Sequence, residues 1–361
     1  MEADQPIDPE PPVEPPTHHA RKNRFVRIGL ITLAVLTAAG VLAGVVMYAT
    51  GTEKPTRFPI AEGSKKAGAD EEDPGDQGVI STAKPSASPL PSPSGPAVKP
   101  DGLGYWPSQA TTGVPPGTKL RPSGDISVTK SGTVIEGVEV TGCIEIKTSN
   151  VTIRKSKINA KGCGVKTDLE GTYKNILIED VEIDGLNDLK VIILGWTGFT
   201  CRRCYLHGAF SGAHPRSNTV IEDSYINTVI EGGSSEGRHL SGIGFHGGSG
   251  MVLRHNRVEC SVSGCSAALS LYGNFEQVAN VLVEDNYFSG GGYCVYAGSL
   301  KSKPFPLAMN TKFFRNAFAK TGTGEFPKCG RFGPVVSYEA GNGNEWKDNY
   351  WFDEKKTPIV L

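Results

Sequence analysis

The sequence has almost no excess of charge of either sign. Its 361 residues hold 37 Lys and Arg against 38 Asp and Glu, a formal net charge of -1. A protein that captures nucleic acid electrostatically needs a basic surface, so this balance argues against a nucleic-acid partner. The composition also disfavours helices, because 45 Gly and 25 Pro are poorly suited to helix interiors.

The first 142 residues contain no cysteine, and residues 28–49 contain no charged side chain. At 1.5 Å per residue, that uncharged segment is long enough to cross a bilayer core of about 30 Å. Four Lys and Arg residues precede it within 21–27. The positive-inside rule therefore predicts a cytoplasmic tail at 1–27 and an extracellular C-terminal part, joined by a transmembrane helix at 28–49 that makes the membrane a partner of the chain.

A cleaved signal peptide is the alternative interpretation of 28–49. Its apolar region would span about 7–15 residues after a short basic leader. Here the leader has 27 residues and carries five acidic side chains, so we expect an uncleaved, single-pass anchor in the cell membrane. Residues 50–103 are rich in Pro and Ser and have little apolar bulk to bury, which predicts a disordered linker. The folded domain is then 104–361.

Eight cysteines on the outer side of a membrane predict disulfides, because that compartment is oxidising. About 105 pairings are possible. The two that we expect are Cys260–Cys265 and Cys294–Cys329. Cys201 and Cys204 have the spacing of a redox motif. They lie in a strand-like repeat with no following helix, so we expect them to be structural.

One eight-residue pattern returns along the folded domain. Its copies are TVIEGVEV (133–140), VTIRKSKI (151–158), ILIEDVEI (176–183), FTCRRCYL (199–206), TVIEDSYI (219–226), MVLRHNRV (251–258), VLVEDNYF (281–288), TKFFRNAF (311–318) and NEWKDNYW (344–351). The third and eighth positions are apolar in every copy, which is typical of strands with one face inward. A fixed segment separated by variable loops is typical of a solenoid.

The outward positions form columns that fit stacking of the copies about 4.8 Å apart. Position four alternates in sign over seven copies: Glu136, Arg154, Glu179, Arg202, Glu222, Arg254 and Glu284. Position seven changes from charged residues to tyrosines with one Arg. Position six is Asn in the last four copies, at Asn256, Asn286, Asn316 and Asn349. We expect these asparagines to adopt the left-handed conformation of a sharp corner and to hydrogen-bond up the column.

These patterns predict an all-β domain, a single right-handed parallel β-helix of about nine coils. Segments rich in small residues supply the third strand of some coils: 143–148, 241–248, 266–273 and 334–341. Residues 104–120 are expected to cap the first coil, and Trp346 and Trp351 to close the last.

Several segments resemble bacterial secreted right-handed β-helix repeat proteins of the pectate-lyase-like superfamily. They are NVTIRKSKI, NILIEDVEIDG, NTVIEDSYI, LRHNRV and NVLVEDNYFSGG. The resemblance covers about 104–353. It implies extracellular carbohydrate, a polysaccharide or cell-wall glycan, as the substrate or ligand class. Fold alone does not assign the reaction.

Acidic residues are candidates for two reactions, glycoside hydrolysis and uronate elimination. Glycoside hydrolysis needs two carboxylates flanking the bond, and Glu222–Asp223 is the tempting pair, although Glu222 belongs to the charge column. Uronate elimination needs a base and a cation beside the substrate carboxylate. Asp180, Asp184 and Asp188 are candidate calcium ligands, because calcium prefers oxygen donors. Arg254 is a candidate base, but it too belongs to the charge column.

Histidine supplies the third candidate site. His214 and His246 each lie five residues before a repeat copy, so we expect them on adjacent coils. With His239 and Arg216 they are the candidate catalytic residues, since imidazole transfers protons near neutral pH. A zinc site is disfavoured by the ligand spacing. Candidate substrate-binding residues along the same groove are Lys147, Lys166 and Tyr272.

The segment HLSGIGFHGG (239–248) aligns with a His-x-Asp-(Ala/Gly)-(Ile/Leu)-Gln motif that the resemblance suggests. Here Ser241 stands at the Asp position and Gly244 at the Gln position. Two functions therefore stay open. The domain acts on or binds a polysaccharide, as a uronate lyase or glycosidase-like enzyme, or it is a non-catalytic rod for partner contacts.

Overall fold

The computed structural model describes residues 102–171, 173–228, 240–261, 264–320, 329–353 and 355–361. The predicted tail, the predicted anchor and the linker up to residue 101 lie outside these ranges. Within them, no helix is long and apolar enough to cross a membrane. The described part is all-β, apart from a 3-10 turn, η1 (Leu103–Tyr105).

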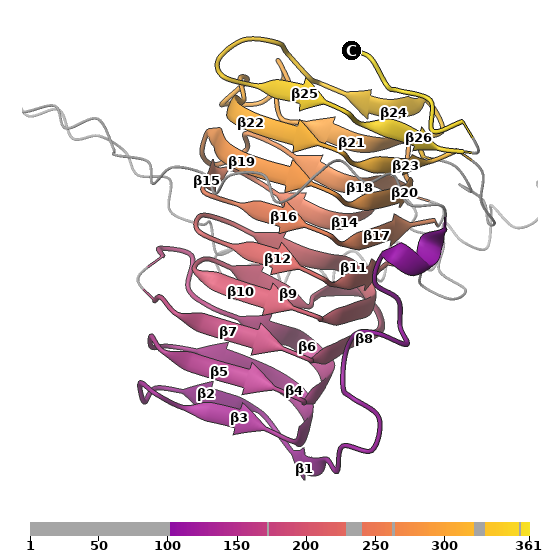
Figure 1. Ribbon diagram of the computed structural model, residues 1–361. Coiled ribbons are helices and arrows are strands. Elements are labelled where there is room, and N and C mark those ends of the chain that lie inside the picture. The colour runs from indigo at the N-terminus through magenta and orange to yellow at the C-terminus, as the bar shows by residue number, and fades with distance from the viewer. Residues whose placement is uncertain (1–101, 172, 229–239, 262–263, 321–328, 354) are drawn as a thin grey trace, which may run out of the picture. The chain divides into compact units, whose positions relative to one another are not determined.

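Parallel strands stack coil upon coil, as Figure 1 shows. One sheet is built from the first half of each repeat copy: β3 (Val134–Glu136), β5 (Val151–Arg154), β7 (Ile176–Glu179), β10 (Phe199–Arg202), β12 (Val220–Glu222), β16 (Val252–Arg254), β19 (Val278–Glu284), β22 (Met309–Phe314) and β25 (Glu345–Lys347). The short β15 (Gly248–Ser249) pairs with β19. All these pairings are parallel.

The second sheet continues each coil past its first corner. Its main path is β1 (Arg121–Ser123), β4 (Val138–Ile146), β6 (Lys157–Lys166), β8 (Glu182–Ile192), β11 (Tyr205–Pro215), β13 (Tyr225–Asn227), β17 (Arg257–Cys260), β20 (Tyr287–Gly290), β23 (Ala317–Ala319) and β26 (Tyr350–Phe352). Third strands branch from it: β2 (Ile126–Val128), β9 (Leu194–Trp196), β14 (Leu240–Phe245), β18 (Cys265–Leu271), β21 (Tyr293–Ala297) and β24 (Gly333–Val336). The stack is compatible with a β-helix.

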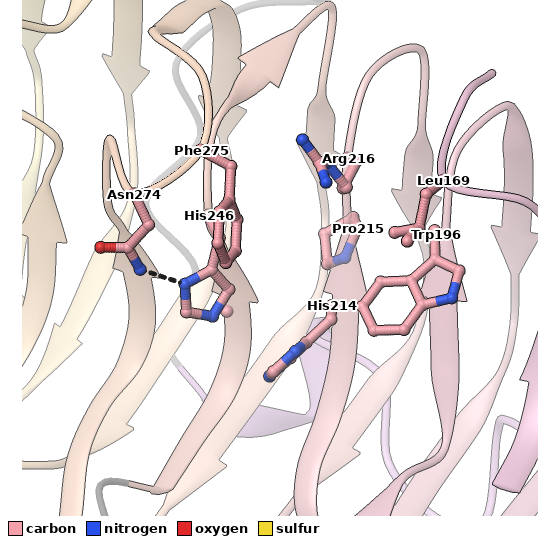
Figure 2. A pocket seen from close by; sticks show the side chains of 9 residues that line it. Leu169, Trp196, His214, Pro215, Arg216, His246, Asn274 and Phe275 are labelled. Carbon is pink, nitrogen blue, oxygen red and sulfur yellow. Dashed lines mark hydrogen bonds between the residues drawn. The ribbon is translucent and has the colours of Figure 1, made fainter. Parts of the chain in front are cut away.

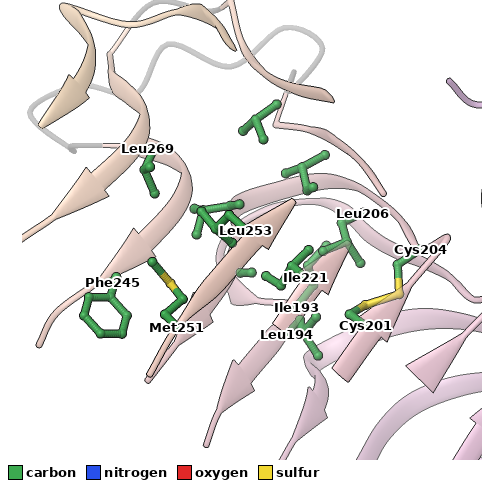
Figure 3. Close-up of a cluster of buried hydrophobic side chains, with 14 of the residues drawn as sticks. Ile193, Leu194, Cys201, Cys204, Leu206, Ile221, Phe245, Met251, Leu253 and Leu269 are labelled. Atoms are coloured by element: carbon green, nitrogen blue, oxygen red, sulfur yellow. A yellow bond between two sulfur atoms is a disulfide. The ribbon is translucent and has the colours of Figure 1, made fainter. Parts of the chain in front are cut away.

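The repeat positions pair with one another as predicted. Ile135 is opposite Ile153, and Glu136 is opposite Arg154, and the same register continues to the last copy. The third and eighth positions fill the interior, and in the first eight copies their side chains are at most 7% exposed. Figure 3 shows part of this core, where Ile221, Leu253 and Leu206 meet between the sheets. In the last copy, Trp346 and Trp351 are only partly buried and pack against the core end.

The first corner of each coil corrects one prediction. The left-handed residue is the fifth of each copy, not the Asn at the sixth: His255 has φ 50° and Asp285 has φ 58°. The predicted hydrogen-bonded column is confirmed, since Asn256 Nδ2 donates to Asn286 Oδ1 at 3.0 Å and Asn286 continues to Asn316 at 3.0 Å. Asn is therefore needed at position six for its buried carboxamide, which also bonds backbone carbonyls, rather than for its backbone freedom.

A second corner precedes every copy. The residue before position one is always Gly or Asn: Gly132, Asn150, Asn175, Gly198, Asn218, Gly250, Asn280, Asn310 and Gly343. All nine have positive φ. These two residue types accept the left-handed region at low cost, so this column sets where each coil turns into its first strand.

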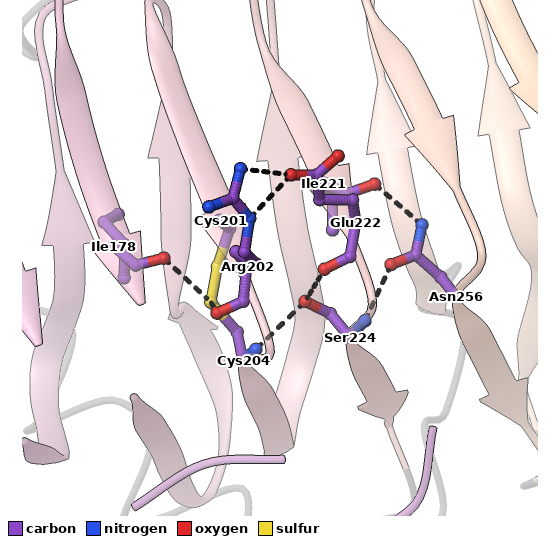
Figure 4. Close-up of a disulfide and its surroundings, with 8 residues drawn as sticks. All are labelled: Ile178, Cys201, Arg202, Cys204, Ile221, Glu222, Ser224 and Asn256. Carbon is purple, nitrogen blue, oxygen red and sulfur yellow. Dashed lines mark hydrogen bonds and ion pairs between the residues drawn. A yellow bond between two sulfur atoms is a disulfide. The ribbon is translucent and has the colours of Figure 1, made fainter. Parts of the chain in front are cut away.

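The charge column holds the coils together on the outside, as Figure 4 shows around Arg202. Its guanidinium pairs with Glu222 at 2.7 Å and with Glu179 at 3.4 Å. The alternation ends on Glu284, a fully buried carboxylate contacted by Arg254 at 2.5 Å and Arg315 at 2.9 Å. Arg254, the candidate base, is thus a member of the column.

All eight cysteines form disulfides. The predicted pairs Cys260–Cys265 and Cys294–Cys329 are confirmed, and the others are Cys143–Cys163 and Cys201–Cys204. Cys201 and Cys204 are fully buried in the core, in agreement with a structural role.

Residues 104–120 do not cap the first coil as predicted. They run along the outside of the stack from the later coils back to the first, as the indigo segment of Figure 1 shows. Trp106 is 2% exposed and its Nε1 donates to the Asp285 carbonyl at 2.9 Å, while its ring lies 5.3 Å from that of Tyr287. The tyrosine column at position seven offers an apolar surface, which explains why the segment, termed here the strap, lies along it.

Candidate functional site

Along β14 and β18, the odd-numbered side chains Ile243, Phe245, Leu269 and Leu271 point into the core, and the even-numbered residues between them face outward. Phe245 and Leu271 are paired in register and are fully buried. The residues on either side of them, Gly244 with Ser270 and His246 with Tyr272, therefore face outward on adjacent coils. The candidate residues of the sequence fall on this outer face.

A cavity of about 540 Å³ opens on this face, shown in Figure 2. Its lining consists of Leu169, Trp196, His214, Pro215, Arg216, Gly244, His246, Asn274 and Phe275. Three of the four candidate catalytic residues therefore line one cavity. The register explains the meeting: Ala213 pairs with Ile243, so His214 is opposite Gly244 and Arg216 is opposite His246.

The two imidazoles point their Nε2 atoms over the same glycine. A Cβ on Gly244 would lie 3.0 Å from Nε2 of His214 and 3.3 Å from Nε2 of His246. The ring centroids are 5.0 Å apart. Gly244 is the residue whose lack of a side chain leaves room for both rings, so its place in the motif, where Gln was expected, opens the cavity.

Both imidazoles are held neutral. Burial, and then the neighbouring His246, lowers the pKa of His214 to about 3. Burial also lowers the pKa of His246, as do the charges of Lys303 and Arg216. On the far side of its ring, His246 Nδ1 lies 2.6 Å from the amide nitrogen of Asn274. An amide N–H donated to Nδ1 leaves the proton of a neutral imidazole on Nε2, toward the cavity.

Arg216 brings a positive charge to the cavity. Its guanidinium pairs with Glu276, a half-exposed carboxylate at the rim, and lies 5.6 Å from the Phe275 ring centroid. Its Nε is buried and has no hydrogen-bond partner among the described residues. None of the residues that line the cavity is acidic. The one cation of the lining is thus Arg216, which is paired with Glu276 and keeps one donor, Nε, without a partner among the described residues.

Comparisons with known proteins add no assignment. Neither a family model nor a curated protein matches the chain.

The other candidate residues lie elsewhere or at the edge. His239 lies outside the described residues. Lys147 and Lys166 belong to the first coils and both pair with Glu145, at 2.5 and 3.0 Å, so neither lines the cavity. Tyr272 is beside it, with its ring centroid 6.0 Å from that of His246.

The three predicted calcium ligands are not gathered. Asp180 pairs with Arg203 at 2.7 Å. Asp184 and Asp188 each accept a backbone N–H two residues on, at 2.8 Å. Across the described ranges, no group of three or more His, Cys, Asp or Glu side chains could hold a metal ion. The calcium site stays a sequence prediction that these contacts do not favour, and we derive no step through calcium.

Sequence reasoning missed the apolar wall of the cavity, Trp196 and Phe275, and the amide of Asn274. Trp196 is the last residue of the third strand β9, in a coil for which the sequence analysis predicts no third strand. Its signal was the group of apolar residues Ile193, Leu194 and Trp196 just before the corner at Gly198. Asn274 and Phe275 lie in the loop after β18, where no repeat pattern exists to place them.

Ser241 stands where the motif suggested by the resemblance has an aspartate. It is 7% exposed, and its hydroxyl lies 2.9 Å from that of Ser270. It does not line the cavity. Ser241 therefore leaves the histidine pair intact.

Proposed function

We propose that residues 104–361 are a right-handed parallel β-helix of the pectate-lyase-like superfamily, held outside the cell by a membrane span at 28–49. We propose further that the domain cleaves a uronate-containing polysaccharide by elimination. The stacked parallel strands and the resemblance of the repeat segments support the first statement. The cavity that brings His214, His246 and Arg216 together, with no acidic residue in its lining, is the observation that carries the second.

The charge of the cavity selects the substrate class. The pKa of His246 is lowered first by burial and then by the charges of Lys303 and Arg216, and an anion that enters beside Arg216 offsets that positive charge. A uronate carboxylate supplies that charge, and the guanidinium holds it through charge-assisted hydrogen bonds. The indole of Trp196 and the ring of Phe275 supply flat apolar walls for a sugar ring.

The reaction needs two proton transfers. His214 Nε2 accepts the proton from the carbon beside the carboxylate, and that C–H electron pair forms the new C=C bond. The bond from the neighbouring carbon to the glycosidic oxygen breaks, and the oxygen takes a proton from His246 Nε2. His214 passes the proton that it accepted to His246, so both imidazoles return to the neutral form. The bound carboxylate raises the pKa of His214 during this step, which makes the imidazole a stronger base than it is in the free protein.

Hydrolysis by two carboxylates finds less support. The candidate acidic pair is held in ion pairs between coils. Glu222 pairs with Arg202 at 2.7 Å, and Asp223 pairs with His255 at 2.7 Å. Neither lines the cavity. Hydrolysis would need a carboxylate of the cavity lining to activate water beside the scissile bond, and no residue that lines the cavity is acidic.

The test compares variants of the full-length chain on polygalacturonate, alginate and hyaluronan, with ultraviolet absorbance of the new C=C bond as the readout. His214→Ala and His246→Ala should lower the rate by about 100-fold or more, as expected for lost proton transfer. Gly244→Ala should lower it as well, because the added methyl group fills the space between the rings. His207→Gln, a histidine of the same strand outside the cavity, is the control and should keep the rate.

A non-catalytic rod is the second candidate, and Ser241 favours it, because the resemblance suggests an aspartate at this position. A rod of this kind would bind a partner but would release no product from any polysaccharide. Equal rates of product formation in His214→Ala and wild type, at unchanged Tm, would remove the cavity from the reaction.

A further inference from the structure

A row of aromatic rings leads away from the cavity along the stack. Beyond His246, successive ring centroids lie 6.0, 5.3, 5.7 and 5.8 Å apart. The members of this aromatic row are Tyr272, Tyr296, Tyr293 and Phe332. Three coil steps of about 4.8 Å separate the coil of His246 from that of Phe332, so the row ends about 15 Å from His246 along the axis.

Register and small neighbours keep the rings open. Tyr296 is opposite Ser270 on one side, and Tyr293 is opposite Gly333 on the other. Both tyrosines, like Tyr272, are only partly buried, and Phe332 is 68% exposed. Large side chains at Ser270 or Gly333 would cover the rings. The outer face thus presents ring surface on several consecutive coils.

The row has the chemistry of a sugar-binding surface rather than of a protein-docking face. Most of its rings carry a hydroxyl, and burial raises the pKa of Tyr272 to about 12, so its O–H remains a donor. The Lys303 ammonium lies 4.8 Å from the Tyr272 ring centroid and adds a positive charge beside the row. Sugar rings offer an apolar C–H face to an aromatic ring and hydroxyls around it, and uronates add a negative charge for Lys303.

We propose that the aromatic row is an extended subsite that binds the unreacted part of a uronate polysaccharide along the axis of the stack, on the C-terminal side of the cavity. This proposal rests on the proposed function for its ligand. It gives the site a direction, since the cavity lies at one end of the row. It also predicts that long chains bind better than short ones.

The experiment measures the affinity of the full-length chain for polygalacturonate, alginate and hyaluronan by their retardation of the protein in native gels. Wild type should be retarded by at least one polymer. Tyr296→Ala and Phe332→Ala should each weaken that binding by about 2- to 10-fold, the size of one lost ring contact. Tyr296→Phe retains the ring and should bind as wild type does. Val134→Ala, an exposed apolar residue of the other sheet, is the surface control.

The outcomes separate the two proposals. Retardation that is unchanged in both Tyr296→Ala and Phe332→Ala overturns the aromatic row, even where His214→Ala is inactive and the proposed function stands. Weakened binding in these variants together with absent cleavage supports the row and contradicts the elimination. Absence of retardation of the folded wild type by all three polymers contradicts both.

Discussion

His255 lies with its Nδ1 2.7 Å from the Asp223 carboxylate of the preceding coil. Its Nε2 lies 3.0 Å from the backbone carbonyl of Tyr105, in the strap. Both partners are acceptors, so an imidazole that makes both bonds must carry protons on both nitrogens. The cation His255 thus joins two coils and holds the strap against them.

This arrangement predicts a pH dependence of stability. The Asp223 partner raises the pKa of His255, and His255 lowers the pKa of Asp223. A raised histidine pKa stabilises the fold below about 6.5, and the contribution is lost as pH rises through the folded pKa; a lowered aspartate pKa stabilises it above about 3.9. The pair therefore contributes fully between about pH 4 and 6.5.

Thermal unfolding of His255→Asn checks this expectation, since Asn tolerates the left-handed backbone of this position. The deficit in Tm against wild type should be larger at pH 5.5 than at pH 8.5. Asp223→Asn should show the same trend. A deficit that is equal at both pH values would contradict a change in the charge of His255 between them.

Glu222→Lys should lower stability rather than activity. The change places three cations in adjacent coils, next to Arg202 and Arg254, at a side chain that is only 15% exposed. The expected cost is on the order of 3 kcal/mol in the free energy of unfolding. Glu145→Lys is the control in the first coil, where the pairs are more exposed and the cost should be about 1 kcal/mol or less. An inactive Glu222→Lys variant of wild-type stability would contradict a purely structural role.

Asn286→Ala should break the buried carboxamide column. The backbone N–H of Asn256 loses its acceptor at 2.9 Å, and the Leu253 carbonyl loses a donor at 3.1 Å. Unsatisfied buried groups cost about 1–3 kcal/mol each, so we expect a loss of roughly 2–4 kcal/mol by chemical denaturation. Asn150→Gly, at an exposed second-corner position, should cost less than about 1 kcal/mol. Equal costs at the two positions would argue against the column.

The disulfides should differ in accessibility. Cys143 and Cys163 are partly exposed, whereas Cys201, Cys204 and the remaining pairs are at most 5% exposed. A mild reductant with an alkylating reagent should label Cys143 and Cys163 first in the folded protein, as read by peptide mass. Early labelling of Cys201 and Cys204 would instead favour a redox role for this pair.

Most of the fold could be predicted from the sequence because the repeat fixes its register. Ile135 opposite Ile153 and Glu136 opposite Arg154 follow directly from aligning the copies. The strap could not be placed in this way. Trp106 lies far along the sequence from Tyr287, and no periodicity links a single non-repeating segment to the coil that it contacts.

The site was only partly predictable for the same reason. His214 and His246 could be brought near each other by their distance from the repeat copies. Asn274 and Phe275 come from a loop of irregular length, whose path depends on side-chain packing rather than on the repeat. Gly244, one of the two positions at which this sequence departs from the motif of the resemblance, is the residue that makes room for the two imidazoles.

The central claim is that the His214–His246 cavity cleaves a uronate polysaccharide by elimination. The most direct measurement is the mass of the products that the full-length chain releases from polygalacturonate, alginate and hyaluronan. The account predicts products lighter than hydrolysis products by one water, absent with His214→Ala. Products of hydrolysis mass, or no products from the folded chain with any of these polymers, would contradict it.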